Sequence, residues 1–379
     1  MLSGMNTALN PFDLNLARAY SAPESFCPRP ELEAALARAS AGQVWTLIDG
    51  DRRMGKSSAV IADSVRHERP LLHVDLMGVS SLAEINERFR WGWQFFSKQV
   101  SGGFWKNIKP EISAKIPGTG VAVKLSSESS KSGEPESWGD VIVAYDMQVG
   151  KTGGLVFIDE FQDLGKLPDE GQKMSRSLRA ALQMTKHVTP ILAGSSQHLL
   201  APFFATSAAA FFKSIGLQHH LRPFARETFG EWAGGIFKSQ KRKFEESALA
   251  RLFELTDGVT ADLVALCAEV WVQGPPRRSI TSTDIETGWR YVVANAAEHF
   301  LPKISMLSEL QARLLRYVAQ NPGMQPFSRE TSVALNVETG SIHGAFARLV
   351  ELELLKVAER DGRKRVWVHD GRLGFYLRA

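Results

Sequence analysis

The chain has 379 residues, which is long enough for two or three domains that each bury a core of their own. Its composition, 44% hydrophobic and 23% charged, is that of an ordinary water-soluble protein, and no run of about 18 apolar residues indicates a membrane helix. The two cysteines, Cys27 and Cys267, are too far apart for a short zinc or redox motif, so a disulfide framework is not expected. The N-terminal residues do not show the basic stretch followed by an apolar stretch that is typical of a targeting segment, so we expect a cytoplasmic protein.

The net charge is +4, and the excess of positive charge lies at the C-terminal end. Residues 303–379 hold twelve of the 45 Lys and Arg residues but only eight of the 41 Asp and Glu residues. This bias favours contact with nucleic acid only weakly, because a few extra charges also keep small domains soluble.

Residues 1–43 are expected to form a linker before the first domain. From residue 44 to 223, short apolar runs alternate with longer amphipathic runs, the pattern of an α/β domain with a parallel sheet. The predicted strands are 44–49, 71–76, 155–159, 190–194 and 216–221, and the predicted helices lie near 55–67, 81–99, 137–149, 171–187 and 197–213. An insertion at about 101–137 interrupts this pattern with a predicted hairpin at 112–127, which is either a surface excursion or a loop that contacts a partner or DNA.

The remaining third of the chain has a different rhythm. Residues 224–302 are predicted to be wholly helical, with breaks near residue 257 and at 274–278. Within 303–379, helices are predicted at 307–320, 328–335 and 340–354, followed by two short strands on either side of Asp361-Gly362. Three helices and a hairpin describe a winged helix-turn-helix.

A phosphate-binding motif lies between the first predicted strand and the helix that follows it. Residues 50–57 fit the pattern G-x-x-x-x-G-K-[ST] without a gap. In this pattern the glycines let backbone N–H groups face the α- and β-phosphates, Lys56 reaches the β and γ oxygens, and the Ser57 hydroxyl binds Mg²⁺. ATP and Mg²⁺ are therefore the predicted cofactors, and the predicted loop residues are Gly50, Asp51, Arg52, Arg53, Met54, Gly55, Lys56, Ser57 and Ser58.

Acidic and small polar residues lie at the ends of the third and fourth predicted strands. Asp159 and Glu160 end a strand at the carboxyl edge of the sheet, beside the P-loop. We expect Asp159 to bind Mg²⁺ and Glu160 to orient or deprotonate the attacking water. The strand after it ends at Ser195 and Ser196, which suit contact with the γ-phosphate but equally well suit capping of the next helix.

The order of these motifs resembles AAA+ and STAND ATPases, in particular the archaeal-type ATPases related to replication initiators. Residues 26–32, FCPRPEL, are similar to a segment of that family near the adenine, which implies that Phe26 and Arg29 contribute to the nucleotide site. Other similar stretches are GDRRMGK, IDEFQ, AGSS and LRPF. The resemblance implies an AAA+-like P-loop core over 44–223, a helical lid over 224–302 and a winged helix over 303–379.

The sequence departs from this family at positions that speed hydrolysis. A Gly-Arg pair common before the last core strand is replaced by Phe212-Lys213-Ser214, and the arginine that initiator-type relatives carry in the lid is missing. Since an arginine finger contributes about 10³–10⁵ in rate, slow turnover is expected. Lys213, with Arg176, Arg179 and Arg222, remains a candidate for this role. Arg52 and Arg53 are interpreted as struts toward Asp51, the lid or a neighbouring subunit, or as a structural ion pair.

In a winged helix the third helix enters the major groove and the wing contacts phosphate. The third predicted helix offers Ser341, His343 and Arg348, a poor set for reading bases. The wing offers Arg360, Arg363, Lys364 and Arg365 for phosphate contact. Two functions follow: an ATP-controlled machine that binds double-stranded DNA, in replication, transposition or defence, or a STAND-like signalling ATPase whose winged helix contacts a protein partner. A homo-oligomer is left open, and no membrane partner is expected.

Overall fold

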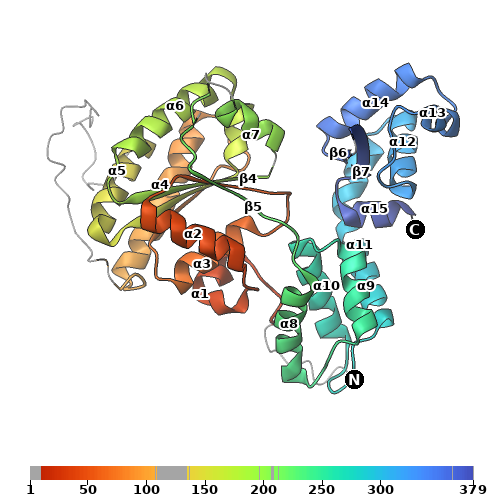
Figure 1. Ribbon diagram of the computed structural model, residues 1–379, viewed down its shortest axis with the longest axis horizontal. Coiled ribbons are helices and arrows are strands. Elements are labelled where there is room, and N and C mark those ends of the chain that lie inside the picture. The colour runs from red at the N-terminus through yellow and green to blue at the C-terminus, as the bar shows by residue number, and fades with distance from the viewer. Residues whose placement is uncertain are drawn as a thin grey trace. The chain divides into compact units, whose positions relative to one another are not determined.

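A computed structural model describes residues 10–106, 108, 135, 137–195, 197–205, 209–211, 213–360 and 362–378 (Figure 1). The chain forms two compact units. One unit is Leu14–Pro223, and the other combines Met1–Asp13 with Phe224–Ala379. The predicted hairpin at 112–127 lies outside the described residues.

A five-stranded parallel sheet forms the centre of the unit Leu14–Pro223, with the strand order β2-β3-β4-β1-β5. Strands β1, β3 and β4 are buried along their whole length, as expected when helices cover both faces of a parallel sheet. All five strands begin and end within two residues of the predicted bounds. They are β1 (Thr46–Asp49), β2 (Leu71–Asp75), β3 (Gly154–Asp159), β4 (Val188–Gly194) and β5 (Leu217–His220).

The strand register decides which residues meet at the functional edge of this sheet. Asp49 at the end of β1 pairs with Gly194 at the end of β4, and Asp75 at the end of β2 pairs with Asp159 at the end of β3. Parallel strands end at the same edge, so the loops that follow β1, β3 and β4 gather there. The P-loop therefore lies at the same edge of the sheet as the acidic end of β3 and the polar end of β4.

The helices of this unit largely match the predicted ones. They are α3 (Lys56–Arg66), α4 (Leu82–Ser101), α5 (Trp138–Val149), α6 (Pro168–Met184) and α7 (Gln197–Phe204), with short 3-10 turns η2 (Gly150–Thr152) and η3 (Phe161–Lys166). The predicted helix 197–213 is wrong beyond Phe204. The chain turns back there, because the Phe211 N–H donates to the Phe203 carbonyl at 2.9 Å and the Phe211 ring packs against Phe161 and Phe204.

No helix is predicted before residue 44, yet the structure has two in this segment. They are α1 (Leu16–Ser21) and α2 (Pro30–Gly42), joined by the 3-10 turn η1 (Pro23–Ser25). Helix α2 begins with Pro30 in its first turn, where the missing N–H is not needed, and it buries Leu32, Ala35, Leu36 and Ala39. The segment is thus part of the folded unit rather than a bare linker.

The second unit begins with helices and continues into a helix-and-hairpin segment. The first set is α8 (Arg226–Phe237), η4 (Lys238–Gln240), α9 (Glu246–Thr256), α10 (Thr260–Gln273) and α11 (Ser282–Ser305). The rest, which we call the C-terminal segment (307–378), contains α12 (Glu309–Gln320), α13 (Arg329–Leu335), α14 (Thr339–Glu351), β6 (Leu355–Arg360), β7 (Arg363–Val368) and α15 (Gly371–Arg378). A core that includes Leu314, Ile342 and Val366 joins these elements.

The C-terminal segment contains the three helices and the hairpin that its sequence predicts. Strands β6 and β7 pair antiparallel around residues 361–362, and Gly362 has a φ of +67°, which suits a two-residue turn. Helix α15 is not predicted, and it buries Leu373 and Gly374. Among the described residues, no helix is long and apolar enough to cross a membrane.

Candidate nucleotide site

The backbone of residues 50–55 turns tightly between β1 and α3. Gly50 has a φ of +150° and Gly55 a φ of +78°, values that side chains rarely allow. A Cβ on Gly50 would also lie 2.7 Å from the Leu221 carbonyl oxygen. Both glycines of the motif are therefore required by local geometry, as the phosphate-loop pattern predicts.

Lys56 begins helix α3 and is 5% exposed. Its ammonium group donates to the carbonyl oxygens of Gly50 at 3.0 Å and of Asp51 at 3.1 Å, so it lies within the loop. Burial lowers the pKa of Lys56, whereas the nearby carboxylates of Glu160 and Asp159 raise it. A positive charge is thus placed inside the loop and close to the two acidic residues at the end of β3.

Ser57 and Asp159 are 102 positions apart in the chain, but their side chains are in contact. The Ser57 hydroxyl donates to Asp159 Oδ2, and the Asp159 side chain is almost fully buried. Burial raises the pKa of Asp159 to about 6, the Ser57 hydrogen bond opposes the rise, and the Glu160 charge adds to it. His73 Nε2 on β2 lies 4.0 Å from the same oxygen, and burial lowers the pKa of His73 to about 4.

The oxygens of Ser57 and Asp159 fit a magnesium ion. Mg²⁺ prefers hard oxygen ligands, and it is usually held by one or two carboxylates together with substrate phosphates. In the part of the chain that the structure describes, no group of three or more His, Cys, Asp and Glu side chains could hold a metal ion. A metal at this site would therefore depend on Ser57, Asp159 and the phosphates of a bound nucleotide.

Glu160 follows directly at the edge of the sheet, in a left-handed backbone conformation with a φ of +49°. Its N–H donates to Asp159 Oδ1 at 2.9 Å, and its Oε2 accepts a hydrogen bond from the Ser195 hydroxyl at 3.1 Å. The structure thus brings Glu160 together with Ser195 at the end of β4. Gln162 also donates to Glu160 Oε2, a contact that the sequence does not predict, although Gln162 belongs to the motif IDEFQ.

Two other residues, Ser196 and Lys213, are predicted from the sequence to take part in catalysis. Ser196 lies outside the described residues. Lys213 is exposed three residues before Gly216, whose N–H donates to the Trp45 carbonyl at 3.0 Å, at the amino end of β1. Lys213 therefore belongs to the opposite edge of the sheet from Asp159 and Glu160, and the prediction that it acts in this site is not supported within one chain.

Arg29 connects the N-terminal segment to the P-loop. Its guanidinium donates to the Met54 carbonyl at 3.0 Å and to the Arg222 carbonyl at 2.7 Å. Phe26 is 8% exposed, so its ring is largely covered by the protein. Arg29 thus contacts the loop itself, whereas the predicted role of Phe26 beside the adenine stays a prediction.

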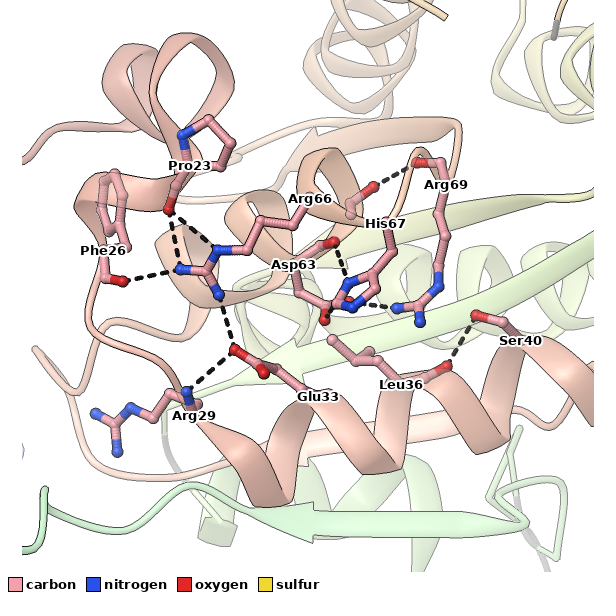
Figure 2. Close-up of polar contacts among 11 residues, drawn as sticks. Pro23, Phe26, Arg29, Glu33, Leu36, Ser40, Asp63, Arg66, His67 and Arg69 are labelled. Carbon is pink, nitrogen blue, oxygen red and sulfur yellow. Dashed lines mark hydrogen bonds and ion pairs between the residues drawn. The ribbon is translucent and has the colours of Figure 1, made fainter. Parts of the chain in front are cut away.

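Arg66 at the end of the P-loop helix holds the same N-terminal segment (Figure 2). Its guanidinium donates to the carbonyl oxygens of Pro23 and Phe26, each at 2.9 Å, and to the Glu33 carboxylate at 2.7 Å. Glu33 Oε1 also accepts the N–H of Arg29 at 3.2 Å. Residues 23–33 are therefore bound both to the P-loop, through Arg29, and to the C-terminal end of α3, through Arg66.

Arg52 and Arg53 differ in their placement. Arg52 is exposed, and its charge contributes to lowering the pKa of Lys56, after the larger effect of burial. Arg53 is half-buried and has a φ of +68°, so it occupies a left-handed position of the loop turn. Their predicted role as struts stays a prediction.

On α14, the three candidate DNA-binding residues are exposed. The His343 ring stacks on Phe327 with a centroid distance of 4.0 Å, and Arg348 forms an ion pair with Glu351 at 2.7 Å. Ser341 lies near the start of the same helix. Two of the three side chains are thus engaged by their own segment.

On the hairpin, Arg363 and Lys364 are exposed at the start of β7. The register places Lys364 opposite Glu359, and the half-buried Arg365 donates to the Gly323 carbonyl at 3.1 Å. Arg360 pairs with Arg363 in the ladder, but its side chain lies outside what the structure describes. The exposed positive charge of the hairpin is therefore concentrated on Arg363 and Lys364 among the side chains described.

No protein-family model and no curated protein matches the sequence. Among solved structures, the Walker-type ATPase PABY2304 of Pyrococcus abyssi matches with a TM-score of 0.67 and 19% identity, over 97% of this chain and 100% of that chain. The RuvB Holliday junction branch migration motor of Thermotoga maritima matches with a TM-score of 0.47 and 12% identity, over 94% of this chain and 96% of that one.

The Orc1 protein of Aeropyrum pernix, solved in complex with DNA, matches with a TM-score of 0.47 and 13% identity, over 95% of this chain and 94% of that chain. With TM-scores below 0.5, the similarities to RuvB and Orc1 are too distant to establish the fold. The likeness to PABY2304 covers both chains almost completely, and at this identity it speaks for the fold alone. The resemblance inferred from the motifs is therefore confirmed at the level of the fold, and the chain has the fold of a Walker-type P-loop ATPase.

Proposed function

We propose that the protein binds ATP with Mg²⁺ and hydrolyses it slowly to ADP and phosphate. The observation that carries this proposal is the hydrogen bond between Ser57 of the P-loop helix and the buried Asp159 at the end of β3. Lys56 lies in the adjoining loop, and Glu160 lies one residue beyond Asp159. These residues supply a cation for phosphate, oxygens for a metal and a carboxylate for water.

Each residue then has a chemical role. Lys56 and the loop N–H groups hold the phosphates, and Mg²⁺, when bound to Ser57 and Asp159, neutralises phosphate charge. The oxygen of a water molecule attacks the γ-phosphorus, and the bond between that phosphorus and the bridging oxygen of ADP breaks. The Glu160 carboxylate orients this water and accepts its proton. Because the sequence departs from the related family at the Gly-Arg pair and at the lid arginine, we expect slow turnover that a partner accelerates.

Two variants separate binding from hydrolysis. Lys56→Ala should weaken ATP binding at least about 100-fold, because the buried phosphate ligand is lost. Glu160→Gln should bind ATP normally but hydrolyse it about 10²–10⁴ times more slowly, since the general base is lost. ATP titration and phosphate release measure the two effects, with exposed Lys98→Ala as the control. Tight ATP binding by Lys56→Ala would contradict the proposal.

We further propose that the C-terminal segment is a winged helix that contacts the phosphates of double-stranded DNA through Arg363 and Lys364. The support is the order of three helices and a hairpin, with exposed cations beside the turn. The double variant Arg363→Gln and Lys364→Gln should weaken DNA binding. The negative slope of log K against log salt concentration should become shallower by about two, because two phosphate contacts are lost. Arg290→Gln on α11, also an exposed arginine, is the control.

A second candidate is a STAND-like switch whose C-terminal segment contacts a protein. Three basic side chains of this segment already contact groups of the same chain. Arg348 pairs with Glu351, Arg365 donates to the Gly323 carbonyl, and Arg372 lies 3.6 Å from the buried Asp262 on α10. If no DNA binds at low salt, with or without ATP, the switch is favoured over the DNA-binding machine.

A further inference from the structure

Gln162 is a buried polar residue that the proposed chemistry leaves without a role. It lies on η3, two residues after Glu160, and is only 1% exposed. Its amide nitrogen donates to Glu160 Oε2 and to the Ser195 hydroxyl at 3.3 Å, and its amide oxygen accepts the Ser195 N–H at 3.2 Å. Both ends of the Gln162 amide are therefore used to connect the end of β3 with the end of β4.

The hydrogen bonds on Glu160 are asymmetric. Gln162 and the Ser195 hydroxyl both donate to Oε2. Among the residues described by the structure, none donates a hydrogen bond to Oε1. The carboxylate is thus fixed through one oxygen, while the other is left to accept a hydrogen bond from a molecule other than the described protein groups.

The position of the Gln162 side chain is itself enforced by packing. A Cβ on Gly194 would lie 2.5 Å from Gln162 Oε1, so only the glycine at the end of β4 leaves room for this amide. The preceding residue, Phe161, is fully buried and packs against Phe203 and Phe211, which anchors η3. Gly194 therefore leaves room for the Gln162 amide beside Glu160, and the buried Phe161 anchors the turn that carries Gln162.

We infer that Gln162 is a positioning residue, which with Ser195 fixes Glu160 through Oε2 and reserves Oε1 for the attacking water. This inference rests on the proposed ATPase function and deepens it. During attack, the water proton passes to Oε1 as the water oxygen bonds to the γ-phosphorus and ADP leaves. A base that is misplaced by about 1 Å loses roughly 10²-fold in rate, so the orientation of Glu160 has a measurable effect.

The test compares Gln162→Met, which keeps length but removes both polar ends, with Gln94→Met at an exposed position of α4. For Gln162→Met we expect kcat to fall about 10–100-fold, with the Kd for ATP and Mg²⁺ unchanged within about twofold. Gln94→Met should keep the wild-type kcat. Ser195→Ala, which removes one donor to Oε2 but leaves the Gln162 amide, gives a second reading and should lower kcat without changing the Kd.

A double-mutant cycle separates positioning from a merely structural role. If Gln162 acts through Glu160, Gln162→Met added to Glu160→Gln should lower kcat less than about twofold further. An equal loss of kcat in both backgrounds, or wild-type kcat in Gln162→Met and Ser195→Ala, would overturn the inference while the ATPase function stands. If the wild-type protein shows no Mg²⁺-dependent hydrolysis, the proposed function fails first, and the inference falls with it.

Discussion

Arg29 illustrates how a single side chain can connect the P-loop to the rest of its unit. Its guanidinium donates to the Met54 and Arg222 carbonyls, and burial lowers its pKa to about 10, so it stays charged at neutral pH. In Arg29→Met both carbonyls lose a charged donor, a change that costs about 1–3 kcal/mol. We expect a lower unfolding midpoint and ATP affinity reduced several-fold, measured by thermal unfolding and ATP titration.

The control for this prediction is Arg38→Met. Arg38 lies on α2 within the same unit and is exposed, so its loss should leave both stability and ATP affinity unchanged. Equal effects of Arg29→Met and Arg38→Met would show that the two carbonyl contacts of Arg29 contribute nothing.

Cys27 provides a chemical probe of the same N-terminal segment. Burial raises the pKa of its thiol to about 12, an effect that the charges of Arg29 and Arg66 only partly oppose. A free thiol is about half ionised at pH 8.5, and only the thiolate reacts. At that pH we expect alkylation of Cys27 in a Cys267→Ser variant to be about 10³ times slower in the native protein than in urea. Similar rates would show that Cys27 is open to solvent.

At the scale of elements, close approach of α4 to β2 explains a glycine within a long helix. A Cβ on Gly92 would lie 2.6 Å from the His73 carbonyl oxygen and 3.4 Å from side-chain atoms of Leu72 and Val74. Gly92→Ala should therefore destabilise the protein by about 1–3 kcal/mol through overpacking. Urea unfolding measures the change.

A helical glycine without close neighbours is the matched control. Gly234 on α8 has no atom within 4 Å of the position that a Cβ would take. Gly234→Ala should stabilise the protein by up to about 1 kcal/mol, because alanine is the better helix former. The two substitutions are chemically identical, so opposite signs would isolate the contact with His73. A Gly92→Ala protein as stable as wild type would contradict the predicted clash.

The elements that sequence predicted well are those with strong apolar patterns. Strands β1, β3 and β4 are buried throughout and form short apolar runs between amphipathic helices, so their bounds are close to the predicted ones. Helix α2 was missed because only two of its four buried residues, Leu32 and Leu36, are large and apolar, and the other two are alanines. Helix α15 was missed because Gly371 and Gly374 lower its helix propensity, and the buried Leu373 shows that tertiary packing stabilises it.

In the candidate site, too, some residues could be predicted from the sequence and others could not. Motif spacing predicted Lys56, Ser57, Asp159 and Glu160 as site residues, because the chemistry of a P-loop fixes which residues lie where along the chain. Gln162 was not recognised, since its partner Ser195 lies 33 positions away and only the fold makes them neighbours. The carbonyl partners of Arg29 were hidden for the same reason, because a carbonyl group carries no sequence signal.

At the scale of the whole molecule, the residues of the proposed nucleotide site and of the proposed DNA contact lie in different compact units. Leu14–Pro223 contains the P-loop, Asp159 and Glu160, whereas Arg363 and Lys364 belong to the other unit. The connection between them begins directly after Arg222, whose carbonyl accepts a hydrogen bond from Arg29. Arg29 therefore connects Met54 of the P-loop to a residue that lies just before the second unit begins.

We expect two thermal transitions in calorimetry, because two compact units with separate cores need not unfold together. ATP with Mg²⁺ should stabilise only the unit Leu14–Pro223, by about 2.7 kcal/mol at 100 times its Kd, which raises that midpoint by roughly 5–10 °C. Glu160→Gln keeps ATP intact during the scan, and Lys56→Ala, which loses ATP binding, should show no shift. A single transition would contradict independent units, and a shift confined to the transition of the C-terminal unit would place the nucleotide away from the P-loop.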